Sequence, residues 1–90
     1  MDKLNLMQSF IAVAEQGSYT SAAKKRGKTK ALMSAHVAQL EDALEIRLIN
    51  RSTRSVLLTE SGKAYYEQAK RILDDIVNLE NTLKNQNAGL

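Results

Sequence analysis

The seven residues KKRGKTK, from 24 to 30, carry five positive charges around one glycine. The whole chain has 13 Lys and Arg against 10 Asp and Glu, so its formal net charge is only +3 and the positive charge is concentrated locally. Such a local cluster of ammonium and guanidinium groups is typical of a surface that binds a polyanion. The alternative is a run of lysines that only keeps the surface soluble.

The remaining polar residues predict no catalytic or metal site, so we expect neither an enzyme nor a bound cofactor. The chain has no cysteine, and its single histidine, His36, cannot make a zinc site by itself. We expect His36 to be a packing residue at the border of a buried helical stripe, and the alternative is a contact with the backbone or with a phosphate. A cluster of carboxylates follows at Glu41, Asp42 and Glu45. It predicts either a solvated surface run or a set of partners for Arg47.

Three helices are predicted in the first half of the chain, over about residues 3–16, 19–26 and 30–44. Apolar residues recur three and four positions apart in the first and third segments, as in an amphipathic helix. Gly17 and Gly27 end the first two helices, and Thr29 is a good N-cap for the third. The buried stripe of the third helix is predicted to be Met33, Val37, Leu40 and Leu44.

A hairpin and a long helix are predicted in the second half. The β-prone runs RLIN and SVLL flank Arg51-Ser52-Thr53-Arg54, which indicates a hairpin with a basic tip over about 47–58. Thr59 caps a helix that reaches about residue 86. A heptad seam follows this helix. We expect a single core to bury part of its early half against the first helix, and its later half to pair two subunits. The residues of the seam are Tyr65, Ala69, Ile72, Ile76, Leu79 and Leu83.

The predicted fold is mainly α. It is a winged helix-turn-helix, made of three helices and a two-stranded β wing, followed by a long dimerisation helix. We expect the winged helix-turn-helix over 1–59 and the linker helix over 60–90. No apolar run approaches the about 18 residues of a membrane helix. The N-terminal LMQSFIAVAEQ is interrupted by Gln8 and Ser9, so it is expected to be a helix and not a signal peptide. We expect a cytoplasmic protein.

The face of the third helix opposite its buried stripe is rich in alanine. An exposed alanine face lets a helix backbone approach another surface closely. In a DNA major groove, alanine methyls can pack on thymine methyls, while serine can bond to base edges. Two other readings are that these alanines simply favour the helix, or that they pack on another helix of the protein.

Three segments of the chain, FIAVAEQGSYTSAA, AQLEDALEIRLINR and TRSVLLTESG, resemble the N-terminal DNA-binding domain of LysR-type transcriptional regulators. The resemblance covers about residues 4–80. It implies a winged helix-turn-helix, a linker helix that pairs two subunits, and binding to imperfect inverted repeats of double-stranded DNA. It also implies a separate effector-binding domain, which is absent from this chain.

Residue by residue, the resemblance implies a set that reads bases: Thr29, Lys30, Ala31, Ser34 and Ala35. It implies wing contacts at Arg51, Thr53 and Arg54. In a helix-turn-helix the lysine-rich edge lies over the phosphates, so we also predict a set that contacts the DNA backbone: Lys24, Lys25, Arg26 and Lys28.

The sequence departs from the family pattern at the turn and on the third helix. Ala31 replaces a common proline, and Ala35 replaces an arginine that could bond to guanine. Arg26 and Lys28 stand where apolar residues are usual. Leu32 stands where a small residue is usual. We hypothesise that it refills the space vacated at 28, and the alternative is a cavity or a shifted turn.

The leading interpretation is a sequence-specific DNA-binding domain of a dimeric transcription regulator. The third helix, about 30–44, would enter the major groove, and the wing, about 47–58, would lie near the minor groove. The alternative is a winged-helix module that binds a protein partner through its long helix. The basic turn and wing favour DNA, because an interaction module has no need for them.

Overall fold

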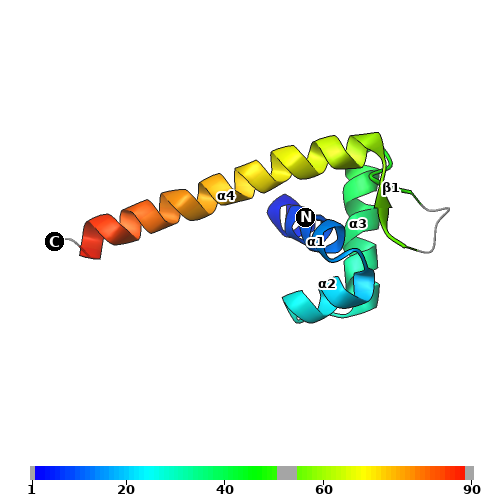
Figure 1. Ribbon diagram of the computed structural model, residues 1–90, viewed down its shortest axis with the longest axis horizontal. Helices are drawn as coiled ribbons and strands as arrows, with labels where there is room; N and C mark the ends of the chain where they lie inside the picture. Colours follow the sequence, from blue (N-terminus) through cyan, green and yellow to red (C-terminus); the bar gives the residue numbers. More distant parts are fainter. Residues whose placement is uncertain (1, 51–54, 89–90) are drawn as a thin grey trace.

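The structure is a computed structural model that describes residues 2–50 and 55–88, with side chains described as far as residue 86. Its elements follow in the order α1 (Lys3–Gln16), α2 (Tyr19–Arg26), α3 (Lys30–Leu44), β1 (Ile49–Asn50), β2 (Leu57–Leu58) and α4 (Glu60–Ala88). The first three helices and the two strands form a head, and α4 leaves this head as a long arm (Figure 1). The molecule therefore measures 54 × 25 × 23 Å.

The predicted helix ends are confirmed by their capping contacts. Side-chain oxygens of Ser18 and Thr29 accept hydrogen bonds from the backbone N–H three residues later, at 3.0 and 3.1 Å. Gly17 and Gly27 follow α1 and α2 with φ of 73° and 65°. This left-handed conformation suits glycine, which has no Cβ to clash. Thr59 caps α4 by accepting from Gly62 N at 2.9 Å.

The core lies where α1, α3 and the start of α4 meet. Phe10 and Val13 of α1 are fully buried beside Met33 and Val37 of α3. The Tyr65 ring of α4 meets Phe10 edge to face, with 5.5 Å between ring centroids, a favourable aromatic geometry. The buried stripe predicted for α3 is thus confirmed at Met33, Val37 and Leu40.

Two apolar expectations on α3 are wrong. Leu44, predicted to be buried, is 38% exposed, because α3 ends there and the chain turns away at Glu45. Leu32 was expected to refill space at the turn. It is also 38% exposed, on the outer side of the first turn of α3.

The two strands pair antiparallel, with Ile49 opposite Leu58 and Asn50 opposite Leu57. The two strands of the predicted wing are confirmed. Its predicted tip residues, Arg51, Thr53 and Arg54, lie outside the described residues. The wing leads directly into α4 at a tight contact. A Cβ on Gly62 would lie 2.0 Å from the backbone oxygen of Leu48, so only glycine fits there.

The heptad seam of α4 is divided between two environments. Ala69 is 1% exposed and Tyr65 packs on the same core, so both belong to the head. Farther along α4, Ile72, Val77, Leu79 and Leu83 are 47% to 61% exposed. The expectation that part of the early seam packs against the first helix is confirmed, but the assignment of Tyr65 and Ala69 to the seam between subunits needs correction. Tyr65 and Ala69 already pack within their own chain.

The predicted end of α4 near residue 86 agrees with the observed Ala88 within the usual uncertainty of helix ends. The division into 1–59 and 60–90 stays a prediction, and the first turns of α4 pack in the head. Among the described residues, no helix is long and apolar enough to cross a bilayer.

Candidate nucleic-acid interface

The segment α2–turn–α3 forms a helix-turn-helix whose turn is Gly27, Lys28 and Thr29. Gly27 N donates to the Lys24 carbonyl at 3.3 Å, and Lys28 N donates to the Ala23 carbonyl at 2.9 Å. These bonds satisfy the last carbonyls of α2 and redirect the chain into α3. The N-terminus of α3, with its unpaired N–H groups and partial positive charge, therefore opens at the turn.

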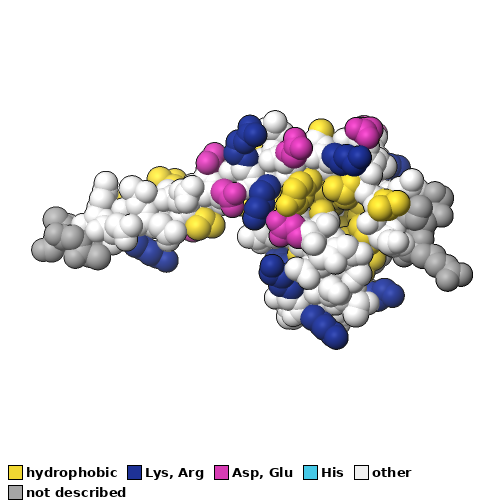
Figure 2. Space-filling view, in the orientation of Figure 1, with side chains coloured by type: hydrophobic (Ala, Val, Ile, Leu, Met, Phe, Trp, Pro, Cys, Tyr) yellow, Lys and Arg dark blue, Asp and Glu magenta, His cyan; other side chains and the backbone are white. Residues whose placement is uncertain are grey.

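Four lysines surround this turn, and all four side chains are exposed: Lys24, Lys25, Lys28 and Lys30. None of them makes an ion pair within the described part of the chain. Lys24 and Lys25 stand in the last turn of α2, where the helix dipole favours cations. Lysine and arginine side chains are visible over this end of the head (Figure 2). The predicted cationic edge is therefore present and accessible on the described surface.

The residues expected to read bases lie together on the first turns of α3. Thr29, Lys30, Ala31 and Ala35 are exposed, and Ser34 is half-buried. Spacings of three and four place Ala31, Ser34 and Ala35 on one helical face. The Thr29 hydroxyl oxygen already accepts from Leu32 N, so its hydrogen is the part left for an outside acceptor.

Arg26 departs from the predicted set that contacts the backbone. Its guanidinium points toward α1, where it donates to Asn5 Oδ1 at 3.1 Å, Gln8 Oε1 at 3.3 Å and the Ser9 hydroxyl. A guanidinium engaged in this way is not available to a phosphate. We therefore remove Arg26 from the set and keep Lys24, Lys25 and Lys28.

Glu41 anchors the start of the wing to the end of α3. Its side chain is only 3% exposed, and its Oε2 accepts hydrogen bonds from Leu48 N at 2.8 Å and Ile49 N at 3.1 Å. Its Oε1 pairs with Arg47 at 3.4 Å. The predicted pairing with Arg47 is confirmed for Glu41, but the reading of Glu41 as part of a solvated run is wrong.

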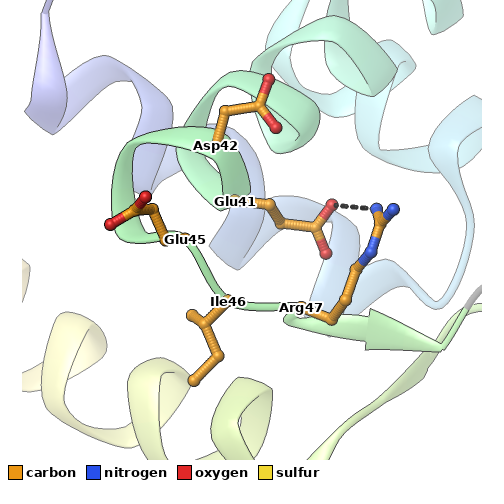
Figure 3. A pocket seen from close by; sticks show the side chains of 5 residues that line it. All are labelled: Glu41, Asp42, Glu45, Ile46 and Arg47. Carbon is orange, nitrogen blue, oxygen red and sulfur yellow. Dashed lines mark hydrogen bonds and ion pairs between the residues drawn. The ribbon is translucent and has the colours of Figure 1, made fainter.

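The neighbouring carboxylates, Asp42 and Glu45, are exposed. Together with Glu41, Ile46 and Arg47 they line an open cavity of about 310 Å³ at the end of α3 (Figure 3). In the figure only Glu41 points toward Arg47, while Asp42 and Glu45 point away from it. No group of three or more potential metal ligands occurs among the residues that the structure describes.

Residues 4–63 match the family model described as "Bacterial regulatory helix-turn-helix protein, lysR family". The chain belongs to the LysR family. This membership confirms the resemblance drawn from its sequence motifs.

Curated LysR relatives extend well beyond this chain. A HTH-type transcriptional repressor of Pseudomonas aeruginosa is 44% identical over 84 residues, which is 93% of this chain and 26% of the relative. The HTH-type transcriptional activator AaeR of Escherichia coli is 40% identical over 83 residues, 92% of this chain and 27% of the relative. The chain thus spans about a quarter of the length of the curated relatives it matches.

Solved LysR structures share the fold. The BenM DNA-binding domain, in a complex with benA site 1 DNA, matches with a TM-score of 0.92 and 30% identity over 100% of both chains. The CbnR DNA-binding domain in its DNA complex matches with a TM-score of 0.84 and 31% identity, covering 96% of this chain and 98% of that chain. The predicted winged helix-turn-helix with its long helix is confirmed.

One group of polar residues in this LysR domain was missed by sequence reasoning. His36, expected to pack or to contact the backbone or a phosphate, is 8% exposed and places Nδ1 2.6 Å from the Ser9 hydroxyl oxygen. Burial lowers the pKa of His36, and the positive charges of Arg26 and Lys28 lower it further. The available signal was a polar pair, Gln8 and Ser9, inside the apolar run of the first helix.

Proposed function

We propose that this chain is the sequence-specific, double-stranded DNA-binding part of a dimeric LysR-type transcription regulator. The observation that carries the proposal is the first half of α3. There an exposed face of small side chains lies between accessible lysines, next to the open N-terminus of the helix. Helix N-termini and lysines attract phosphates, and small side chains allow close approach to base edges. DNA-bound neighbours with the same fold support this proposal.

Different residues carry affinity and specificity. Lys24, Lys25 and Lys28 would contact phosphates, which hold the domain in register without distinguishing sequences. Lys30 and Ser34 would bond to base edges in the major groove. Ala31 and Ala35 would contact thymine methyls, and Thr29 would donate its hydroxyl hydrogen. Arg51, Thr53 and Arg54 at the wing tip remain proposed contacts near the minor groove.

The partner of α4 would be the same helix of a second subunit. Ile72, Leu79 and Leu83 form an exposed apolar stripe beyond the head, with the half-buried Ile76 between them, and apolar side chains stand out along the arm in Figure 2. A stripe at this spacing is typical of paired helices. Two heads joined in this way would match an imperfect inverted repeat. We accordingly assign DNA recognition to 1–59 and pairing to 60–90.

We further propose that the chain acts on DNA in the cytoplasm and has no enzymatic activity. The second candidate function is a protein-interaction module that uses the exposed stripe of α4 without DNA. The lysines around the turn distinguish the two functions, because a helix-docking module does not need a phosphate-binding edge.

The test is a salt titration of alanine variants on one duplex selected from a random pool and on one scrambled duplex. Lys24→Ala and Lys28→Ala should weaken binding to both duplexes and lower the slope of log K against log salt by about one each. Ser34→Ala should cost about 1–3 kcal/mol on the selected duplex and little on the scrambled one. If the lysine variants leave affinity and slope unchanged on both duplexes, the lysine edge is only a solvated surface.

A further inference from the structure

A continuous set of polar contacts joins α1, α2 and α3 beneath the turn. Ser9 of α1 is fully buried, and its Oγ both accepts from the Arg26 guanidinium and lies 2.6 Å from His36 Nδ1. The guanidinium also reaches the Asn5 carbonyl at 3.4 Å and the Asn5 side chain at 3.1 Å. No buried side-chain polar atom in the described part of the chain lacks a partner. The three helices of the head are therefore tied together by hydrogen bonds as well as by apolar packing.

Hydrogen-bond chemistry assigns the protons in this network. Arg26 can only donate, so the Ser9 oxygen is an acceptor toward α2. The Ser9 hydroxyl has one hydrogen, and His36 Nδ1 is the acceptor within reach of it. Donation of this hydrogen to Nδ1 gives the Ser9 oxygen, its hydrogen and Nδ1 a partner each. We assign this arrangement, in which the neutral imidazole carries its proton on Nε2.

We propose that the Arg26–Ser9–His36 network is a positioning brace that holds the recognition helix α3 against α1 and loosens when His36 takes a proton. The proposal rests on the proposed function, because α3 is the element that would read DNA. His36 and Arg26 act through the position of α3 and do not touch DNA themselves.

The charges around His36 explain why a proton would loosen the brace. Arg26 from α2 and Lys28 from the turn are the described charged groups that act on His36, and both are positive. On the α1 side, His36 contacts Ser9, and the Arg26 guanidinium contacts Asn5 and Gln8. All three α1 residues are neutral. Protonation turns Nδ1 from an acceptor into a donor. The imidazolium and the guanidinium would then both direct N–H donors at the same Ser9 oxygen.

The direction of the pH effect follows from the lowered pKa of folded His36. The unfolded chain binds this proton near pH 6.5, whereas the folded chain binds it at a lower pH. Stability from the neutral histidine is therefore fully present above about pH 6.5 and is lost as the pH falls below it. Since His36 is the only histidine, few other groups titrate in this window.

The variant Arg26→Lys distinguishes a positioning role of Arg26 from a phosphate contact, because lysine keeps the positive charge but lacks the planar guanidinium. The single ammonium nitrogen of lysine cannot span the side-chain acceptors on α1 that the two terminal guanidinium nitrogens reach. We therefore expect about tenfold weaker binding to the selected duplex and a lower melting temperature, with an unchanged salt slope. Lys24→Ala is the matched control from the same turn of α2. It should lower the salt slope and leave the melting temperature unchanged. Wild-type affinity and melting temperature in Arg26→Lys would overturn the brace.

The proton step is tested by melting the 90-residue chain between pH 5.5 and pH 7.5 and by following the His36 ring by NMR. The melting temperature should fall on acidification, and His36→Gln should abolish that fall while keeping an acceptor for Ser9. Ser9→Ala should raise the NMR pKa of His36. A His36→Gln protein that keeps the wild-type pH profile would overturn the proposal. If the pH effects are found but no selected duplex binds, the brace stands and the proposed function is wrong.

Discussion

Arg26 and Glu41 show how the surroundings of a charged side chain decide its role. Both belong to segments that look like surface charge in the sequence, one basic and one acidic. In the structure Arg26 faces the polar residues of α1, and Glu41 turns inward to accept two backbone N–H groups of the wing. Each charge is therefore used to join elements, since buried or half-buried charges require hydrogen-bonding partners.

Glu41→Gln should destabilise the chain by about 1–3 kcal/mol, because a neutral amide accepts less strongly from two N–H groups and no longer pairs with Arg47. Chemical denaturation measures the free energy, and amide hydrogen exchange measures the local effect. The amides of Leu48 and Ile49 should exchange faster. Asp42→Asn, exposed on the same helix end, is the control and should change neither. Unchanged protection of both amides in Glu41→Gln would contradict the anchoring role.

At the scale of elements, α4 is one continuous helix in two environments. Its first turns are held by the tight approach of Gly62 to Leu48 and by burial of Ala69. Beyond Leu73, Val77, Leu79 and Leu83 are exposed and Ile76 is half-buried. An exposed apolar stripe on a long helix marks an interaction site.

Leu79→Asp should convert a dimer to monomers, because a carboxylate would have to be buried without a partner between two paired helices. Leu79 is 61% exposed in the single chain, so the substitution leaves the head intact. Sedimentation at micromolar concentration measures the assembly, and circular dichroism checks the fold. Asn78→Asp adds the same charge on the neighbouring residue outside the stripe and should remain dimeric. A native chain that sediments as a monomer would contradict pairing through α4.

At the scale of the whole molecule, polar contacts join α1 of the head to α4 where the two helices cross. Tyr66 donates to Glu15 Oε2 at 2.8 Å, and Lys70 lies 3.5 Å from the same oxygen. The hydrogen bond to Glu15 raises the pKa of Tyr66, with burial and nearby carboxylates adding to the effect. These contacts lie where α4 leaves the head, and from Lys70 to its end at Ala88 the helix extends about 27 Å farther. A rotation of about 5° at this point would move the far end by about 2 Å.

Glu15→Gln should therefore broaden the preferred spacing between two half-sites, while affinity for a single half-site stays the same. The amide weakens both contacts of Glu15 and leaves the apolar core untouched. Band shifts on duplexes whose half-sites differ by single base pairs provide the measurement. Glu67→Gln, exposed on α4 one position beyond Tyr66, serves as the control. A spacing preference that stays sharp in Glu15→Gln would show that apolar packing alone sets the angle.

Much of the fold could be predicted from the sequence because its signals are local. Helix ends depend on caps such as Thr29 and on glycines such as Gly27, which act within one turn. The accessible lysines around the turn follow from the same local reading. The LysR family was also recognisable, because its motifs follow one another in order along the chain.

The tertiary structure decided which residues share an environment. Arg26 was misassigned because its partners on α1 lie 17 to 21 residues away in the chain. Ala69 was misassigned because a heptad pattern does not distinguish a helix that pairs within the chain from one that pairs between subunits. The sequence by itself determined the elements and the basic edge, since these depend on neighbouring residues. Only the folded chain brought Ser9, Arg26 and His36 together, because contacts across three helices exist only after the helices pack.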